Sequence, residues 1–178
     1  MERGFESLSV LLREDDVGAR ATLRGMLKAM GVGHVIEAGD EQQAYRALDC
    51  LAPDVMLCGE ALRSSDALAL VRGFRRRQFH PMADLPVILL LDRERLARAA
   101  AARAAGVSYV LLKPLAYRAL RDVIRRAMAA RQPFIQAAAY CGPDRRGEWT
   151  HDRRREADTM TSFGVQLSAA EIKVLLGN

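Results

Sequence analysis

Acidic residues and one lysine follow two apolar runs of the sequence, where they could bind a cation or a phosphoryl group. Glu14 and Asp15 lie just beyond the run Leu8–Leu12, and Lys113 directly follows the run Tyr109–Leu112. Carboxylate oxygens are ligands that suit Mg²⁺, and a lysine ammonium binds phosphate oxygens as a point charge. If both runs are strands of one parallel sheet, these groups could meet at the edge formed by the carboxyl ends of the strands.

A third apolar run, Val55–Cys58, delivers no reactive side chain at its end. It is followed by Gly59 and Glu60 in the stretch PDVMLCGE. Glycine carries no functional group, and Glu60 is the only carboxylate beside it. Because successive side chains of a strand point to opposite faces, we expect Glu60 to point away from the space next to Gly59.

Short aliphatic runs alternate with longer segments of helical periodicity along about the first 130 residues. Runs rich in Val, Ile and Leu are typical of buried parallel strands. The segments between them carry apolar residues three and four apart, and an alanine-rich helix is expected over 94–105. Asp66 or Ser65 is the expected N-cap of the third helix, and Gly31 and Gly106 are expected C-terminal caps. The sequence therefore predicts a doubly wound α/β domain with strands at Leu8–Leu12, His34–Ala38, Val55–Cys58, Val87–Leu91 and Tyr109–Leu112.

Composition and charge restrict the class of protein. The chain has 178 residues, half of them apolar, which suits one globular domain with an extension. Its net charge of +5 lies in residues 1–133, because residues 134–178 hold six basic and six acidic residues. We find no targeting signal and no stretch approaching the roughly 20 apolar residues of a membrane span. Cys50, Cys58 and Cys141 lack metal-site spacing, so we expect free thiols, a buried Cys58 and a cytoplasmic protein without membrane contact.

Four stretches in order, EDDVGAR, PDVMLCG, PVILLLD and AGVSYVLLKP, resemble the successive motifs of the response-regulator receiver domain of two-component signalling. The resemblance covers residues 8–131 and rests on the order and spacing of the motifs. It implies a flavodoxin-like fold, a five-stranded parallel sheet in the order 2-1-3-4-5, for a receiver-like domain over residues 7–131. Residues 132–178 would form a C-terminal extension.

The resemblance also assigns roles to the residues at the strand ends. In the family, an acidic pair after the first strand holds a divalent metal ion, and a lysine after the fifth strand contacts the phosphoryl group. Alignment through Arg20 of EDDVGAR places the acidic pair on Glu14 and Asp15. The lysine falls on Lys113, and the bond from Lys113 to Pro114 is expected to be the cis peptide common in such domains.

Three positions depart from the family pattern. The family has a phosphate-accepting aspartate after the third strand, a hydroxyl residue after the fourth and a switch aromatic in the fifth. These positions are Gly59, Leu91 and Val110. Formation of an aspartyl phosphate needs a carboxylate nucleophile, which glycine cannot supply. We therefore expect a degenerate receiver that is not phosphorylated.

The loss of one carboxylate also weakens the expected metal site. Mg²⁺ prefers near-octahedral oxygen ligation, so at most weak binding is expected at Glu14 and Asp15, and no other cofactor. In the absence of a metal ion, Lys113 should form an ion pair with one of these two carboxylates. The chain is not expected to be an enzyme.

The C-terminal extension, 132–178, is expected to be partly irregular. CGPD indicates a turn, and Ser168 to Glu171 form a capping box that predicts a short helix near 168–176. A helix this short is marginal in water, so its apolar side should bind a protein surface. The expected partner-binding residues are Trp149, Ile172, Leu175 and Leu176.

Two functions follow from these features. The favoured one is an atypical receiver that acts as a phosphorylation-independent protein-interaction module, with a histidine kinase or another regulator as its partner, or a second copy in a homodimer. The alternative is a DNA-binding response regulator with a reduced or truncated output region, because LSAAEIKVLL resembles the first helix of DNA-binding output domains. A helix-turn-helix needs a second helix, and none follows this segment, so DNA is the less expected partner unless the chain is a fragment of a longer regulator.

Overall fold

A computed structural model describes residues 4–60, 66–77, 82–129, 134–137 and 140–144. The expected helix near 168–176 and the expected partner-binding residues lie outside the described residues. These partner-binding residues are Trp149, Ile172, Leu175 and Leu176.

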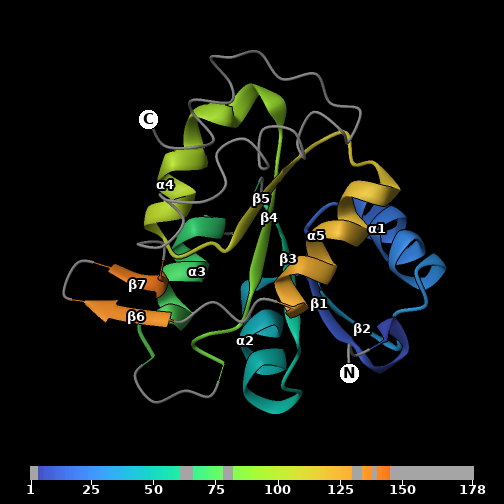
Figure 1. The fold of residues 1–178 in the computed structure, drawn as a ribbon, viewed down its shortest axis with the longest axis horizontal. Helices are drawn as coiled ribbons and strands as arrows, with labels where there is room; N and C mark the ends of the chain where they lie inside the picture. Colours follow the sequence, from blue (N-terminus) through green and yellow to red (C-terminus); the bar gives the residue numbers. More distant parts are fainter. Residues whose placement is uncertain (1–3, 61–65, 78–81, 130–133, 138–139, 145–178) are drawn as a thin grey trace.

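Five parallel strands form the central sheet in the order β2-β1-β3-β4-β5, as predicted (Figure 1). Three of the five predicted strands have the observed bounds, and β1 and β3 differ by one residue at their ends. The strand β3 includes Gly59, which pairs with Leu90 of β4. The strands are β1 Ser9–Arg13, β2 His34–Ala38, β3 Val55–Gly59, β4 Val87–Leu91 and β5 Tyr109–Leu112.

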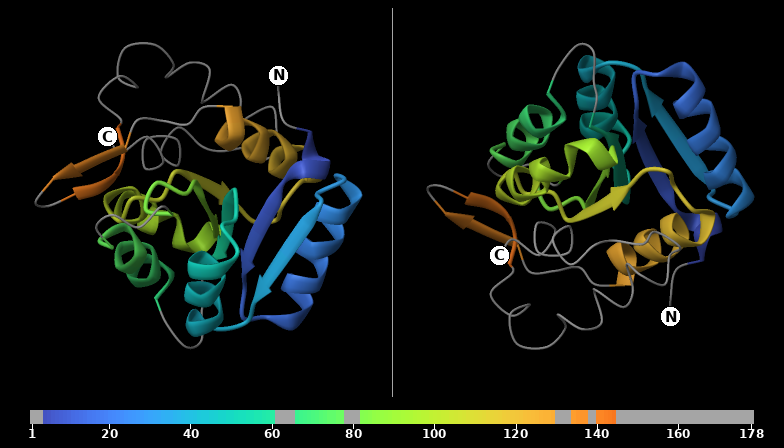
Figure 2. Two further views of the ribbon diagram at one scale, coloured as in Figure 1. Left: turned by 90° about the horizontal axis from the view of Figure 1, so that it is seen from below. Right: turned by 90° about the horizontal axis from the view of Figure 1, so that it is seen from above.

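Helices cover both faces of the sheet (Figure 2). The helices α1 and α5 pack on one aliphatic cluster, while α2, α3 and α4 pack on the other. Asp16, Asp40 and Asp66 cap α1, α2 and α3 by accepting hydrogen bonds from backbone amides of the first turn. The helices are α1 Val17–Ala29, α2 Glu41–Cys50, α3 Ala67–Arg75, α4 Ala99–Ala104 and α5 Tyr117–Ala129, with 3-10 helices η1 Phe5–Ser7 and η2 Arg93–Arg98.

Left-handed backbone confirms the two predicted glycine caps. Gly31 follows α1 with φ of 81°, and Gly106 follows α4 with φ of 90°. This region of φ is accessible to glycine without the steric cost of a Cβ atom. The bond between Lys113 and Pro114 is cis, as expected.

The single helix predicted over 94–105 is wrong. The segment divides into η2 and the short α4, and Arg95 lies outside helical geometry at φ −104° and ψ 15°. Arg95 and Arg98 are three apart and reach the same buried carboxylate, Glu60.

A two-stranded antiparallel hairpin follows the receiver core. It consists of β6 Phe134–Ala137 and β7 Tyr140–Pro143, and it lies beside α3 and α4 in Figure 1. The sequence predicted a turn at CGPD, but Cys141, Gly142 and Pro143 belong to β7. The strand ladder, in which Gln136 pairs with Cys141, takes the place of that turn.

Candidate functional site

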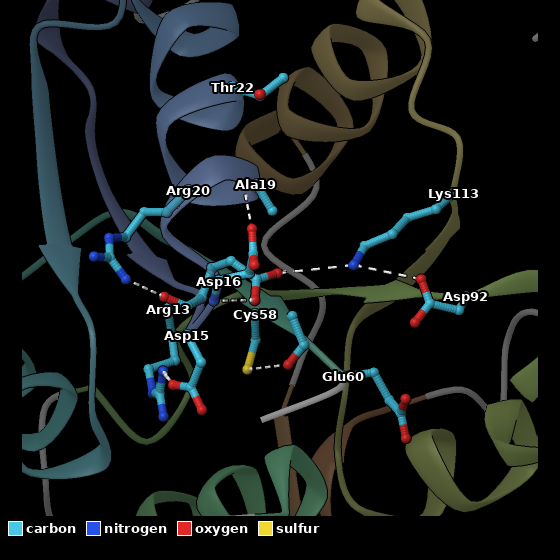
Figure 3. Close-up of polar contacts among 12 residues, drawn as sticks. Arg13, Asp15, Asp16, Ala19, Arg20, Thr22, Cys58, Glu60, Asp92 and Lys113 are labelled. Atoms are coloured by element: carbon cyan, nitrogen blue, oxygen red, sulfur yellow. Dashed lines mark hydrogen bonds and ion pairs between the residues drawn. The ribbon is translucent and has the colours of Figure 1, made fainter. Parts of the chain in front are cut away.

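The carboxyl ends of β1, β4 and β5 bring two carboxylates and one lysine together (Figure 3). Nζ of Lys113 lies 3.8 Å from Oε2 of Glu14 and 3.4 Å from Oδ1 of Asp92. The ion pair expected between Lys113 and the acidic pair is therefore made with Glu14. Asp92, which directly follows β4, is a second partner that the sequence reasoning did not assign, although its place at a strand end was a signal.

The space beside Gly59 is filled by Glu14. A Cβ atom at position 59 would lie 2.3 Å from Oε2 and 2.8 Å from Cδ of Glu14. Real Cβ atoms essentially never approach another heavy atom below 3.0 Å. The carboxylate at position 14 thus occupies the place where a side chain at position 59 would begin.

One hydrogen bond to the side chain and one to the backbone position Glu14. Its Oε1 accepts a hydrogen bond of 3.2 Å from the backbone amide of Asp16, and its side chain is almost fully buried. Its carbonyl oxygen accepts a hydrogen bond of 2.6 Å from Arg20, the residue that anchored the sequence alignment. Glu14 is therefore a buried carboxylate that is ion-paired to Lys113.

Asp15 is held by an arginine that the sequence analysis did not consider. The side chain of Arg13, at the end of β1, is fully buried, forms an ion pair with Asp15 and donates a hydrogen bond of 3.2 Å to the carbonyl of Gly39. An arginine at the end of a buried strand is unusual, because charged side chains are rarely fully buried unless they are paired. An arginine directly after an aliphatic run was therefore the sequence signal that could have indicated a buried ion pair.

The two carboxylates of the acidic pair are not brought together around one position. The two carboxylates have different cationic partners, Lys113 for Glu14 and Arg13 for Asp15. Within the described ranges, no group of three or more His, Cys, Asp or Glu side chains is arranged to hold a metal ion. The residues present therefore do not fit the Mg²⁺ ion that the family uses, and the structure supports no step through such an ion.

The positions of the family's hydroxyl and switch aromatic are part of an aliphatic cluster. Leu91 is fully buried and packs with Leu96, Ala99 and Leu112. Val110 is partly buried and packs against the same cluster. These side chains contribute apolar contacts and have no group that could bind a phosphoryl oxygen.

Glu60 points away from Lys113, as strand alternation predicted (Figure 3). Its buried carboxylate pairs with Arg98 through Oε1 and, at 2.9 Å, with Arg95 through Oε2. Arg98 also donates a hydrogen bond of 2.8 Å to Asp66, the N-cap of α3. The end of β3 is thereby tied to η2 and to α3 by one ion-pair network.

Cys58, beside Gly59, is fully buried, and burial raises the pKa of its thiol to about 12 from an ordinary value of 9.0. Between pH 9 and pH 12 the Cys58 thiol has lost its proton in the unfolded chain but keeps it in the folded protein. The free energy of unfolding should therefore fall as pH rises from 9 to 12, by up to about 1.4 kcal/mol per pH unit from this group. Urea unfolding from pH 8 upward should show a weaker decline for Cys58→Ala, and an equal decline would contradict the assignment.

The comparisons with solved structures agree with this fold. A putative response regulator from Chloroflexus aurantiacus superposes with a TM-score of 0.64 at 22% identity, over 69% of this chain and 98% of that one. The receiver domain of NtrX from Brucella abortus gives a TM-score of 0.62 at 25% identity, over 68% of this chain and 99% of that one. These structures show that the chain has the receiver type of α/β fold.

The family follows from the sequence comparison. The model of the response regulator receiver domain matches residues 10–125, well over half of the chain. The protein named Regulator of RpoS from Escherichia coli K12 is 31% identical over 106 residues, which are 60% of this chain and 30% of that protein. The chain thus spans less than a third of the length of this curated relative. It belongs to the response regulator receiver domain family, whose members act in two-component signalling through protein partners.

Proposed function

We propose that this receiver is a phosphorylation-independent interaction module, with no enzymatic activity of its own. The observation that carries the proposal is the absence of a carboxylate at Gly59 together with the filling of that space by Glu14. A phosphoryl group needs both a nucleophile and room beside it. Gly59 supplies no nucleophile, and the ion pair between Glu14 and Lys113 uses the room.

Two further features support a receiver that holds one conformation. Leu91 and Val110 are packed into an aliphatic cluster, so the contacts that would differ between two signalling states are missing. Glu60 fastens η2 to the end of β3 through Arg95 and Arg98 without a phosphoryl group. Binding to a partner would then depend on this fixed surface.

The proposed partner is a regulatory protein, such as a histidine kinase, another regulator or a second copy of this chain. The relative named Regulator of RpoS supports a regulatory role, but the match covers only 30% of that protein, so its target is not transferred. The alternative of DNA binding rests on residues 167–176, outside the described ranges. Among the helices the structure describes, none is long and apolar enough to cross a membrane.

Partner capture tests the proposal. The full chain is immobilised and exposed to an extract of its source cell, with and without prior treatment with acetyl phosphate and Mg²⁺. We expect the same proteins to be captured in the same amounts under both conditions. A protein captured only by the treated chain would contradict a phosphorylation-independent role.

A magnesium titration gives a second test, independent of any partner. Because Glu14 and Asp15 have separate cationic partners, we expect no saturable heat of binding at millimolar Mg²⁺. Arg13→Gln should increase the affinity by removing the cation from Asp15, whereas Arg24→Gln, on an exposed pair with Glu37, should not. Saturable binding by the unmodified protein would contradict the account of the acidic pair.

A further inference from the structure

Arg75, the last residue of α3, lies between the receiver core and the β6–β7 hairpin. It is 1% exposed, and its guanidinium carbon lies 4.7 Å from the ring centroids of both Phe74 and Phe134. Phe74 belongs to α3, and Phe134 is the first residue of β6. The arginine is therefore stacked against one ring from each of the two parts.

The guanidinium also joins two loops at the amino ends of the strands. Nε and Nη2 donate hydrogen bonds of 3.2 and 3.1 Å to the carbonyl of Gly106, just before β5. Nη1 donates a hydrogen bond of 2.6 Å to the carbonyl of Ala83, in the segment before β4. Burial lowers the pKa of Arg75 to about 10, so these carbonyl groups and the two rings must stabilise the charge.

The backbones of the hairpin and the core approach without room for side chains. A Cβ atom on Gly142 would lie 2.8 Å from Cα of Gly106, and one on Gly106 would lie 2.4 Å from the carbonyl oxygen of Cys141. Sγ of Cys141 donates a hydrogen bond of 2.9 Å to the carbonyl of Arg75. An isolated two-stranded hairpin is at best marginally stable in water, so these contacts are what can keep it folded.

We propose that the surface formed by the end of α3 and the turn between α4 and β5 is a docking site for the hairpin of the same chain, fastened by Arg75. The folded unit then extends to Asp144, beyond the residues 10–125 that the family model matches. Because Ala83 and Gly106 precede their strands, this docking site lies at the opposite end of the sheet from Glu14 and Lys113. The chain beyond Asp144 therefore starts from the side of the molecule formed by α3 and α4.

The three cysteines allow the docking to be measured in the full chain. Cys50 is exposed, Cys58 is buried, and Cys141 is partly exposed and contacts Arg75. Labelling with a maleimide, followed by peptide mass spectrometry, gives a rate for each thiol. Cys141 is partly exposed, but its thiol donates a hydrogen bond to the carbonyl of Arg75 while the hairpin is docked. We therefore expect Cys141 to react more slowly than Cys50 in the unmodified protein, and faster when the hairpin opens.

Two variants outside the receiver core should release the hairpin. Phe134→Ala removes one ring from Arg75, and Gly142→Ala places a methyl group against Gly106. Each should raise the labelling rate of Cys141 by about tenfold, the change expected from losing a desolvated cation–π contact or a close backbone contact. The rates of Cys50 and Cys58 should not change.

Phe5→Ala is the matched control, because it also removes a ring that lies near an arginine. The ring centroid of Phe5 lies 6.0 Å from the guanidinium carbon of Arg125 in α5, which packs on the other face of the sheet. It should leave the rate of Cys141 unchanged. Equal rates for Cys141 and Cys50 in the unmodified protein, or no effect of either variant, would overturn the proposal. Protection of Cys141 that disappears on dilution would assign the docked hairpin to a second copy, and would overturn the assignment to the same chain.

Discussion

Replacing Arg95 and Arg98 together with alanine should lower the free energy of unfolding by about 3–5 kcal/mol. The side chain of Glu60 is fully buried at the end of β3, and these two arginines are its ion-pair partners. Their removal leaves a buried carboxylate without compensating charge, which is far more costly than losing a pair at the surface. Urea unfolding at neutral pH measures the loss.

Two other variants separate this cost from a general effect of removing arginines. Glu60→Gln leaves cations that are 49% and 39% exposed and can be solvated, so a smaller loss of about 1 kcal/mol is expected. Arg77→Ala removes a surface pair with Asp49 and should cost about 0–1 kcal/mol. A double variant no less stable than Arg77→Ala would show that Glu60 does not depend on Arg95 and Arg98.

Gly59→Asp should lower the free energy of unfolding by about 3 kcal/mol in the absence of divalent cations. The new side chain would begin 2.3 Å from the carboxylate of Glu14, so Glu14 has to move and two like charges share a buried space. Mg²⁺ should recover part of the loss, because the variant gains the carboxylate that the natural protein lacks. Signal transmission should not be restored, since Leu91 has no hydroxyl and Val110 has no ring.

A double variant that moves the carboxylate from position 14 to position 59 provides the control. In the double variant Glu14→Ala with Gly59→Asp, one carboxylate again occupies the space near Lys113, so most of the lost stability should return. Gly59→Ala measures the steric part alone. If the double variant is destabilised by the sum of its two single changes, Glu14 and position 59 do not compete for one space.

The sequence predicted β3 and β4 well because each is a short aliphatic run buried on both sides. Val55–Cys58 and Val87–Leu91 carry this signal without help from distant residues, and Asp66 carries its own capping signal. The order of the strands came from the resemblance to the family. At these positions the local sequence signal and the family resemblance predict the same elements.

The ion pairs of the site could be predicted only in part. Sequence reasoning left Glu14 and Asp15 as alternative partners for Lys113, and the packing of Glu14 into the space beside Gly59 decides between them. Glu60 pairs with Arg95 and Arg98 of η2, which are 35 and 38 residues away in the sequence. The helical periodicity of 94–105 does not indicate a contact over that separation.

The hairpin was missed for a related reason. Its strands have four residues each and contain small residues, and β7 includes the first three residues of the turn-forming sequence CGPD. Their stability depends on Arg75 and Gly106, which lie far away in the sequence. Contacts between residues so far apart in the sequence produce no local sequence pattern from which the hairpin could be predicted.

Intact mass spectrometry after incubation with acetyl phosphate and Mg²⁺ tests the central claim most directly. The claim is that a receiver with glycine at position 59, and with Glu14 ion-paired to Lys113 in the adjoining space, accepts no phosphoryl group. We predict an unchanged mass at all times of incubation. A mass increase of one phosphoryl group, mapped to Glu14, Asp15 or Glu60, would contradict the account.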